Sequence, residues 1–106
     1  MEDNYLETSI YLSVIYRKNN TVRLRKVGDE YILVPISGET AKQGSVYSLN
    51  RVGAHVWELI NGERNIKQIL DELAQAYKDA QLETMEIDIQ YFLSDLEKTG
   101  VIDRTE

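Results

Sequence analysis

The chain has 106 residues, of which 42% are hydrophobic, and a formal net charge of −6 at pH 7. This length provides one domain with a modest core and excludes a second. The absence of cysteine excludes disulfides, thiol nucleophiles and iron–sulfur clusters. No run approaches about 18 apolar residues, and the N-terminus is acidic. We therefore expect no membrane span, no secretory signal and a cytoplasmic location.

Charge is distributed unevenly along the chain. Residues 1–15 contain three acids and no base, residues 16–50 six bases and three acids, and residues 51–106 six bases and twelve acids. The middle of the chain is therefore basic and its second half strongly acidic. This polarity could steer a charged partner, but an ordinary solvated surface explains it as well.

The N-terminal segment, residues 1–13, has no clear hydrophobic period, and we expect an arm or tail there. Its apolar residues, among them Tyr5 and Leu12, favour an added strand or a docking arm, and an arm exchanged between protomers would make a homodimer. A frayed terminus is the alternative.

Three strands are predicted next. From Val22, apolar residues alternate with arginines, which predicts the first strand. Gly28 and Asp29 then signal a hairpin turn, and a second strand follows over 31–36, with Pro35 near its end. Residues 37–44 are polar and bounded by glycine, which predicts a loop. Residues 45–49 form the third strand, in which Tyr47 and Leu49 share one face while Val46 and Ser48 share the other.

The second half of the chain predicts three amphipathic helices. Asn50 is a suitable N-cap for the first, over about 51–60, with Asn61 and Gly62 as its stop. Asn65 and Gln68 have capping-box spacing for the second. The third, over about 84–98, ends at Gly100. Its core stripe is Met85, Ile89, Phe92, Leu93 and Leu96.

After the third helix, Val101 and Ile102 have the pattern of a short strand that returns to the sheet. Three strands followed by three helices indicate an α+β fold. We therefore predict a winged helix-turn-helix-like domain with a three-stranded antiparallel sheet followed by three helices.

Little in the sequence suits catalysis. His55 is the only histidine, so neither a thiol dyad nor a histidine-rich metal site can form, and the glycines lack the spacing of a phosphate-binding loop. We expect a non-enzyme without metal or cofactor. Gly53 inside a helix costs stability, which predicts close contact with a neighbouring backbone.

A winged helix raises the alternative of a DNA-binding transcription regulator. A recognition helix needs basic residues to neutralise phosphates. The third predicted helix with its cap region has five acids against Lys98 alone: Glu83, Glu86, Asp88, Asp95 and Glu97. Because this surface would repel a duplex, we expect no nucleic-acid partner.

The segment SVYSLNRVGAHVWELING, residues 45–62, resembles the PqqD-like family, and weaker similarity extends over about 14–103. The resemblance implies that residues 14–106 are a peptide-recognition domain. Its most specific positions are Tyr47, Leu49, Asn50, Gly53, Ala54, Val56, Trp57, Glu58, Leu59, Ile60 and Gly62. Arg51 and Val52 stand where a proline is common in the family, so the resemblance identifies the module and not the natural-product pathway.

In function, the resemblance implies a non-catalytic peptide chaperone. Such a protein binds the leader of a ribosomally synthesised precursor peptide by strand addition and presents it to a tailoring enzyme, such as a radical S-adenosylmethionine protein of the PQQ pathway or a related one. A third alternative is a structural partner domain without a peptide ligand.

By position, the implied peptide site joins the third strand to the third helix. Its residues are Val46, Tyr47, Ser48 and Leu49 on the strand and Ile87, Tyr91, Ser94 and Lys98 on the helix. The helical residues form a second stripe beside the core stripe. In the alternative interpretation, Ile87 and Tyr91 only widen the core face, and Tyr47 is buried beneath the sheet.

Overall fold

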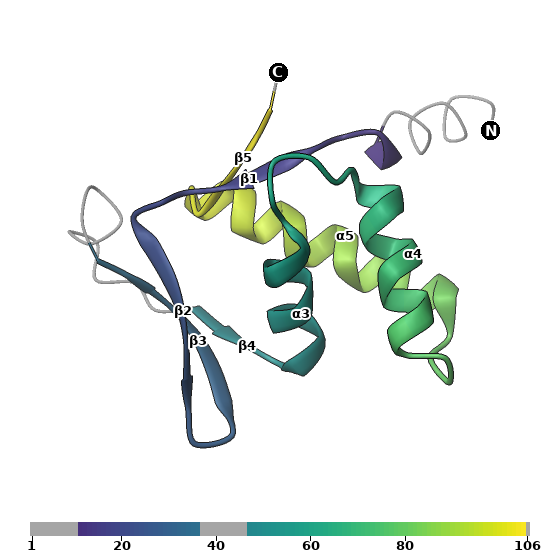
Figure 1. Ribbon diagram of the computed structural model, residues 1–106, viewed down its shortest axis with the longest axis horizontal. Coiled ribbons are helices and arrows are strands. Elements are labelled where there is room, and N and C mark those ends of the chain that lie inside the picture. The colour runs from purple at the N-terminus through teal and green to yellow at the C-terminus, as the bar shows by residue number, and fades with distance from the viewer. Residues whose placement is uncertain (1–10, 37–46, 106) are drawn as a thin grey trace.

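Two small sheets and three helices make up the described part of the chain. A computed structural model describes residues 11–36 and 47–105. In chain order its elements are β1 (Tyr16–Lys18), β2 (Val22–Val27), β3 (Glu30–Pro35), β4 (Tyr47–Leu49), α3 (Arg51–Leu59), α4 (Ile66–Ala76), α5 (Leu82–Thr99) and β5 (Ile102–Arg104) (Figure 1). The predicted α+β class, with a three-stranded sheet followed by three helices in a winged-helix-like arrangement, is confirmed.

The three-stranded sheet is antiparallel, in the order β2-β3-β4. Its first hairpin turns at Gly28, whose φ of 61° is available to glycine at little cost. Pro35 is the last residue of the central strand β3, as expected for a residue without an N–H. The predicted 37–44 loop lies outside the described residues.

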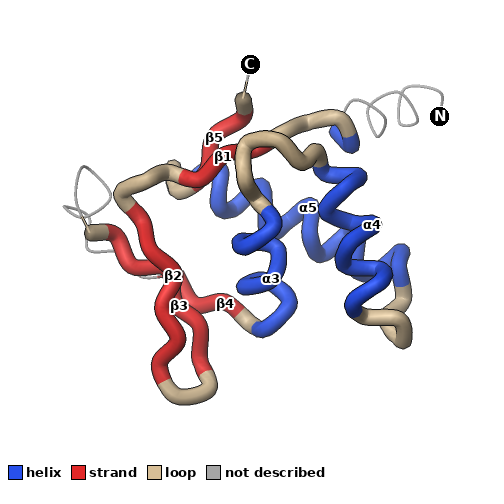
Figure 2. The backbone as a smooth tube through the Cα atoms, in the orientation of Figure 1, coloured by secondary structure: helices blue, strands red, loops and turns tan. Residues whose placement is uncertain are grey.

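The C-terminal strand does not return to this sheet as predicted. Instead, Ile102–Arg104 pairs antiparallel with Tyr16–Lys18 in a separate two-stranded sheet (Figure 2). Two backbone hydrogen bonds flank this pairing: Asn19 N donates to Val101 O at 2.9 Å, and Thr105 N donates to Ile15 O at 2.8 Å. A side-chain hydrogen bond from the Tyr16 hydroxyl to Glu97 ties β1 to α5. The strand β1 was not predicted.

The predicted helix caps are present. Asn50 Oδ1 accepts a hydrogen bond from Gly53 N at 2.7 Å, and Asn65 and Gln68 form a reciprocal capping box with both bonds at 2.9 Å. Gly100 ends α5 with a φ of 82°.

The end of α3 differs from the prediction. The helix stops at Leu59 because Ile60 takes an extended conformation that buries its side chain. Gly62, with a φ of 80°, then turns the chain so that its N–H donates to Tyr16 O at 3.0 Å. The turn therefore ties α3 to β1 instead of ending the helix.

The core lies between the helices and the inner faces of both sheets. Trp57 of α3 is 3% exposed, and the apolar stripes of α4 and α5 are buried around it. Tyr11 and Leu12 pack against this core, so the end of the expected 1–13 arm is part of the folded domain, while residues 1–10 lie outside the described residues. Across the described residues, the helices are too short or too polar to cross a bilayer.

Candidate functional site

One free edge of the three-stranded sheet is formed by β4, which has β3 on one side and no described strand on the other, and β2 forms the opposite edge. In antiparallel pairing, hydrogen-bonded and non-hydrogen-bonded residue pairs alternate. The two-residue turn closes on the pair Val27 and Glu30, and Ile36 N donates to Thr21 O at 2.7 Å. The even-numbered residues of β3 therefore direct their N–H and C=O groups towards β2.

It follows that the odd-numbered residues of β3 bond to β4. Tyr31 is opposite Leu49 and Leu33 is opposite Tyr47, so both of these β4 residues use their backbone groups within the sheet. Ser48, between them, directs its N–H and C=O to the free edge. Unpaired groups of this kind are a template for another extended chain.

The two faces of β4 differ. The Ser48 side chain is exposed on the outer face, whereas Leu49 is buried on the inner face. Tyr47, also on the inner face, meets Phe92 of α5 edge to face, with ring centroids 6.3 Å apart. Burial raises the pKa of Tyr47, and the negative charge of Asp95 raises it further. Phe92 and Asp95 therefore mark the side of α5 that lies along β4.

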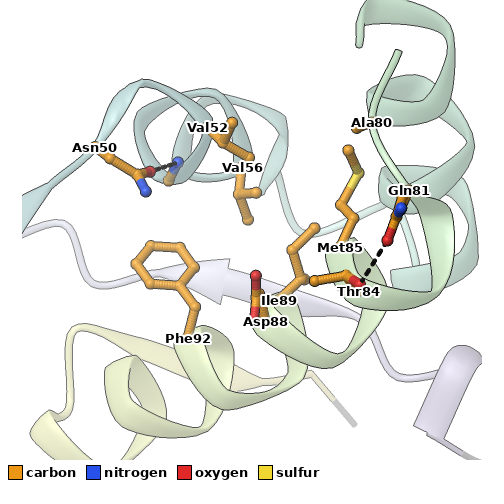
Figure 3. Close-up of a pocket in the computed structure, with 11 residues that line it drawn as sticks. Asn50, Val52, Val56, Ala80, Gln81, Thr84, Met85, Asp88, Ile89 and Phe92 are labelled. Atoms are coloured by element: carbon orange, nitrogen blue, oxygen red, sulfur yellow. Dashed lines mark hydrogen bonds between the residues drawn. The ribbon is translucent and has the colours of Figure 1, made fainter. Parts of the chain in front are cut away.

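A pocket of about 460 Å³ lies between α3 and α5 (Figure 3). Asn50, the residue that follows β4, lines the pocket. Its walls are mostly apolar, and Asp88 and Thr84 stand on the α5 side (Figure 3). The lining residues are Asn50, Val52, Gly53, Val56, Ala80, Gln81, Thr84, Met85, Asp88, Ile89 and Phe92.

Gly53 shapes this pocket. A Cβ at this position would lie 3.4 Å from Phe92 Cζ and 3.2 Å from Asn50 Oδ1. The close contact predicted for Gly53 is therefore present, but its partners are side chains and not a neighbouring backbone. The missing side chain lets the Phe92 ring come up against α3, where it forms one wall of the pocket.

The predicted helical site residues lie elsewhere on α5. Ile87 is 53% and Tyr91 71% exposed, Lys98 is also exposed, and Ser94 is half-buried. None of the four lines the pocket. On β4, Tyr47, Ser48 and Leu49 lie at the sheet edge as described above, whereas Val46 lies outside the described residues.

The sequence patterns did not predict that one side of α5 lines a pocket. Thr84, Asp88 and Phe92 follow one another on successive turns, so they share one side of the helix. The predicted core stripe includes Phe92 and the predicted acidic surface includes Asp88, so neither prediction indicates a pocket. The signal that could have identified this side is the glycine within α3, which marks where a side chain from another element approaches.

His55 lies outside this pocket. Its Nδ1 is 3.2 Å from the Tyr77 hydroxyl, and it lines another, smaller hollow between α3 and the end of α4. Within residues 11–36 and 47–105, no set of three or more His, Cys, Asp or Glu side chains is placed to share a metal ion. The larger pocket and the β4 edge are therefore the features that suit a ligand.

Comparison with known proteins gives two similarities. The family model of PqqD, described as coenzyme PQQ synthesis protein D, matches residues 30–102, which include β4, α3 and α5. The fold is similar to TbiB1, solved in complex with the TbiA(beta) leader peptide, with a TM-score of 0.64 and 22% identity over 82% of this chain and 94% of TbiB1. No curated protein sequence gives a significant match.

Proposed function

The chain belongs to the PqqD family, and from that premise we propose that it binds the leader of a ribosomally synthesised precursor peptide by strand addition at β4. One observation carries this proposal: Ser48 directs its N–H and C=O to a free edge of the sheet, on the strand whose Tyr47 contacts Phe92 of α5. TbiB1, which shares the fold, was solved with a leader peptide bound. Main-chain pairing would supply affinity, and side chains at alternate positions would supply specificity.

In this proposal the peptide extends the sheet beyond β4. Ser48 pairs with the peptide backbone, while Tyr47 and Leu49 remain bonded to β3 and support the edge from within. Val46 would continue the pairing. Peptide side chains on the inner face of the sheet meet α5 at Phe92, whose ring already contacts Tyr47.

At its margin, the proposed site also includes the outer side of α5. Tyr91 is adjacent to Phe92 and offers an exposed ring. Ile87, Ser94 and Lys98 lie on the same helix and do not line the pocket, and a peptide would contact them where it crosses the helix. Exposed apolar side chains such as Ile87 and Tyr91 suit this use, because burial against a ligand removes apolar area from water.

We further propose that the domain is non-catalytic and presents the bound leader to a tailoring enzyme, such as a radical S-adenosylmethionine protein. Its family membership supports this role. The DNA-binding alternative is weaker, because α5 presents Asp88 at the pocket and Asp95 near Tyr47 of β4, and these carboxylates would repel phosphates.

The experiment compares Ser48→Pro with Ser48→Ala. Proline removes the N–H at the free edge, whereas alanine keeps it and changes only an exposed side chain. Using peptides selected from a displayed random library, we expect Ser48→Pro to weaken binding about tenfold, since the hydrogen bond donated by the backbone N–H of residue 48 is lost, and Ser48→Ala to bind like the parent. Both variants should melt close to the parent.

NMR titration with a selected peptide locates the binding edge. Perturbations should appear together at Tyr47–Leu49 and along α5. Equal binding by Ser48→Pro and the parent, or perturbations confined to residues 22–36, would contradict strand addition at β4.

A further inference from the structure

Within the peptide-binding function just proposed, on which this inference rests, we propose that the pocket between α3 and α5 accepts one large apolar side chain of the bound peptide. Asp88, at the pocket's rim, then selects a lysine or arginine close to it in the peptide. The ligand class is therefore an extended peptide that combines a bulky apolar residue with a neighbouring basic residue.

The size and lining of the pocket indicate an apolar occupant. Its volume of about 460 Å³ falls in the range of ligand pockets. Val56, Met85 and Ile89 are buried at its walls, while Val52 and Phe92 are half-buried. An apolar side chain that enters would remove the remaining exposed surface of these residues from water.

The position of the pocket indicates that its occupant belongs to a chain already paired with β4. Asn50, directly after the strand, lines the pocket, and its side chain is held by the hydrogen bond that Gly53 N donates to Asn50 Oδ1. Phe92 contacts both features: its ring meets Tyr47 of β4 and also forms a pocket wall. A peptide that follows the edge past Ser48 and Asn50 therefore approaches the pocket.

Charge identifies the neighbouring residue of the peptide. Asp88 is an exposed lining residue, and Asp95 lies close enough to Tyr47 to affect its pKa. Among residues 11–36 and 47–105, ion pairs join Lys67 to Asp71 and Arg104 to Glu97, and no cation pairs with Asp88 or Asp95. A lysine or arginine can lay its aliphatic stem on the apolar wall while its charged end reaches the carboxylate.

Two variants test the two parts of the proposal separately. Thr84→Trp adds an aromatic ring at an exposed rim position, where it can fill the pocket without replacing a core residue. Asp88→Lys reverses the charge of the rim. Glu83 is exposed next to Thr84 on the same helix and does not line the pocket. It gives the matched controls Glu83→Trp and Glu83→Lys.

The probe is a displayed library of random peptides, sequenced after selection on the parent and on each variant. On the parent we expect a bulky apolar residue with Lys or Arg a few positions away. Thr84→Trp should lower the apolar enrichment about tenfold, and Asp88→Lys should change the basic preference to an acidic one. Raised salt should weaken only the charge preference. Both controls should select the parental motif.

The outcomes separate this inference from the function on which it rests. If Ser48→Pro weakens binding while Thr84→Trp and Asp88→Lys keep the parental motif, the pocket is not a specificity site, although strand addition stands. If the parent selects no peptide, the proposed function fails and this inference with it. Thermal melting checks the fold of each variant, and Ala80→Trp, at another exposed lining position, repeats the pocket test if Thr84→Trp is unfolded.

Discussion

Tyr47 and Phe92 meet edge to face, with ring centroids 6.3 Å apart and ring planes inclined at 61°. Through this contact, the edge strand β4 and the helix α5 hold each other in position at the mouth of the pocket. Both rings are half-buried. The geometry of the proposed peptide site therefore depends on an interaction that can be measured without any ligand.

A double-mutant cycle on this pair should give a coupling free energy of about 0.5–1.5 kcal/mol, the range for aromatic pairs in this geometry. The measurement is urea unfolding of Tyr47→Ala, Phe92→Ala and the double variant. Tyr47→Ala combined with Tyr91→Ala is the control and should be additive, since Tyr91 is 71% exposed. A coupling near zero for the first pair would mean that the rings do not hold β4 against α5.

Trp57 should be the most costly residue to truncate in α3. It is 3% exposed, and the Lys18 ammonium lies 5.3 Å from its ring centroid. Trp57→Ala should lower the free energy of unfolding by about 3–5 kcal/mol, a large part of the roughly 5–15 kcal/mol that stabilises a domain. Chemical denaturation measures the loss.

The neighbouring residue supplies the control for Trp57→Ala. Glu58 is exposed, so Glu58→Ala should change the stability by no more than about 0.5 kcal/mol. If Trp57→Ala melted within a few degrees of the parent, α3 would not be packed against the core as described.

The features that the sequence predicted correctly depend on local interactions. Asn50 and Asn65 each accept a hydrogen bond from a backbone N–H three residues along the chain, and Gly100 takes the left-handed conformation at its own position. The backbone groups involved are close in sequence, so residue type and spacing are sufficient to identify them.

The features that were missed depend on contacts between distant segments. Tyr16–Lys18 is too short to show a period, and it becomes a strand because Ile102–Arg104, near the other end of the chain, pairs with it. Likewise, helical spacing placed Phe92 on the core face of α5. Only its approach to Gly53 of α3 makes Phe92 a pocket wall as well.

Tyr11 should be one of the few residues whose truncation stabilises the protein. Its hydroxyl is buried and has no hydrogen-bond partner within the described residues. Leaving a buried polar atom unpaired costs free energy, so Tyr11→Phe should raise the free energy of unfolding by about 1 kcal/mol at neutral pH. Tyr16 is the contrasting position, because its hydroxyl donates to Glu97 Oε1 at 3.1 Å.

Denaturation of both variants at neutral pH makes the comparison. Tyr16→Phe should lose about 1 kcal/mol, since the Glu97 carboxylate would lose a hydrogen-bond donor. If Tyr11→Phe destabilised the protein as much as Tyr16→Phe, the Tyr11 hydroxyl would have a partner in solution.

Stability should fall at alkaline pH, and Tyr16 should contribute to the fall. Burial raises the pKa of Tyr16, and the hydrogen bond to Glu97 and that carboxylate's charge raise it further. Burial also raises the pKa of Tyr11. In the unfolded chain both phenols ionise near their usual pKa of about 10. Above that pH the unfolded state holds fewer protons than the folded state, so the free energy of unfolding decreases as pH rises.

The test measures urea unfolding of the parent, Tyr16→Phe and the control Tyr91→Phe between about pH 8 and pH 11, the interval that spans the usual tyrosine pKa. Below the unfolded pKa the Tyr16 contribution is complete, so the curves of the parent and Tyr16→Phe should run parallel there. At higher pH the Tyr16→Phe curve should fall less steeply, because one phenol with a raised pKa is gone. Lys18, whose pKa is lowered by burial, is present in all three proteins and cancels in the comparison. Equal slopes for the parent and Tyr16→Phe above pH 10 would show that Tyr16 ionises as readily in the folded protein as in the unfolded chain.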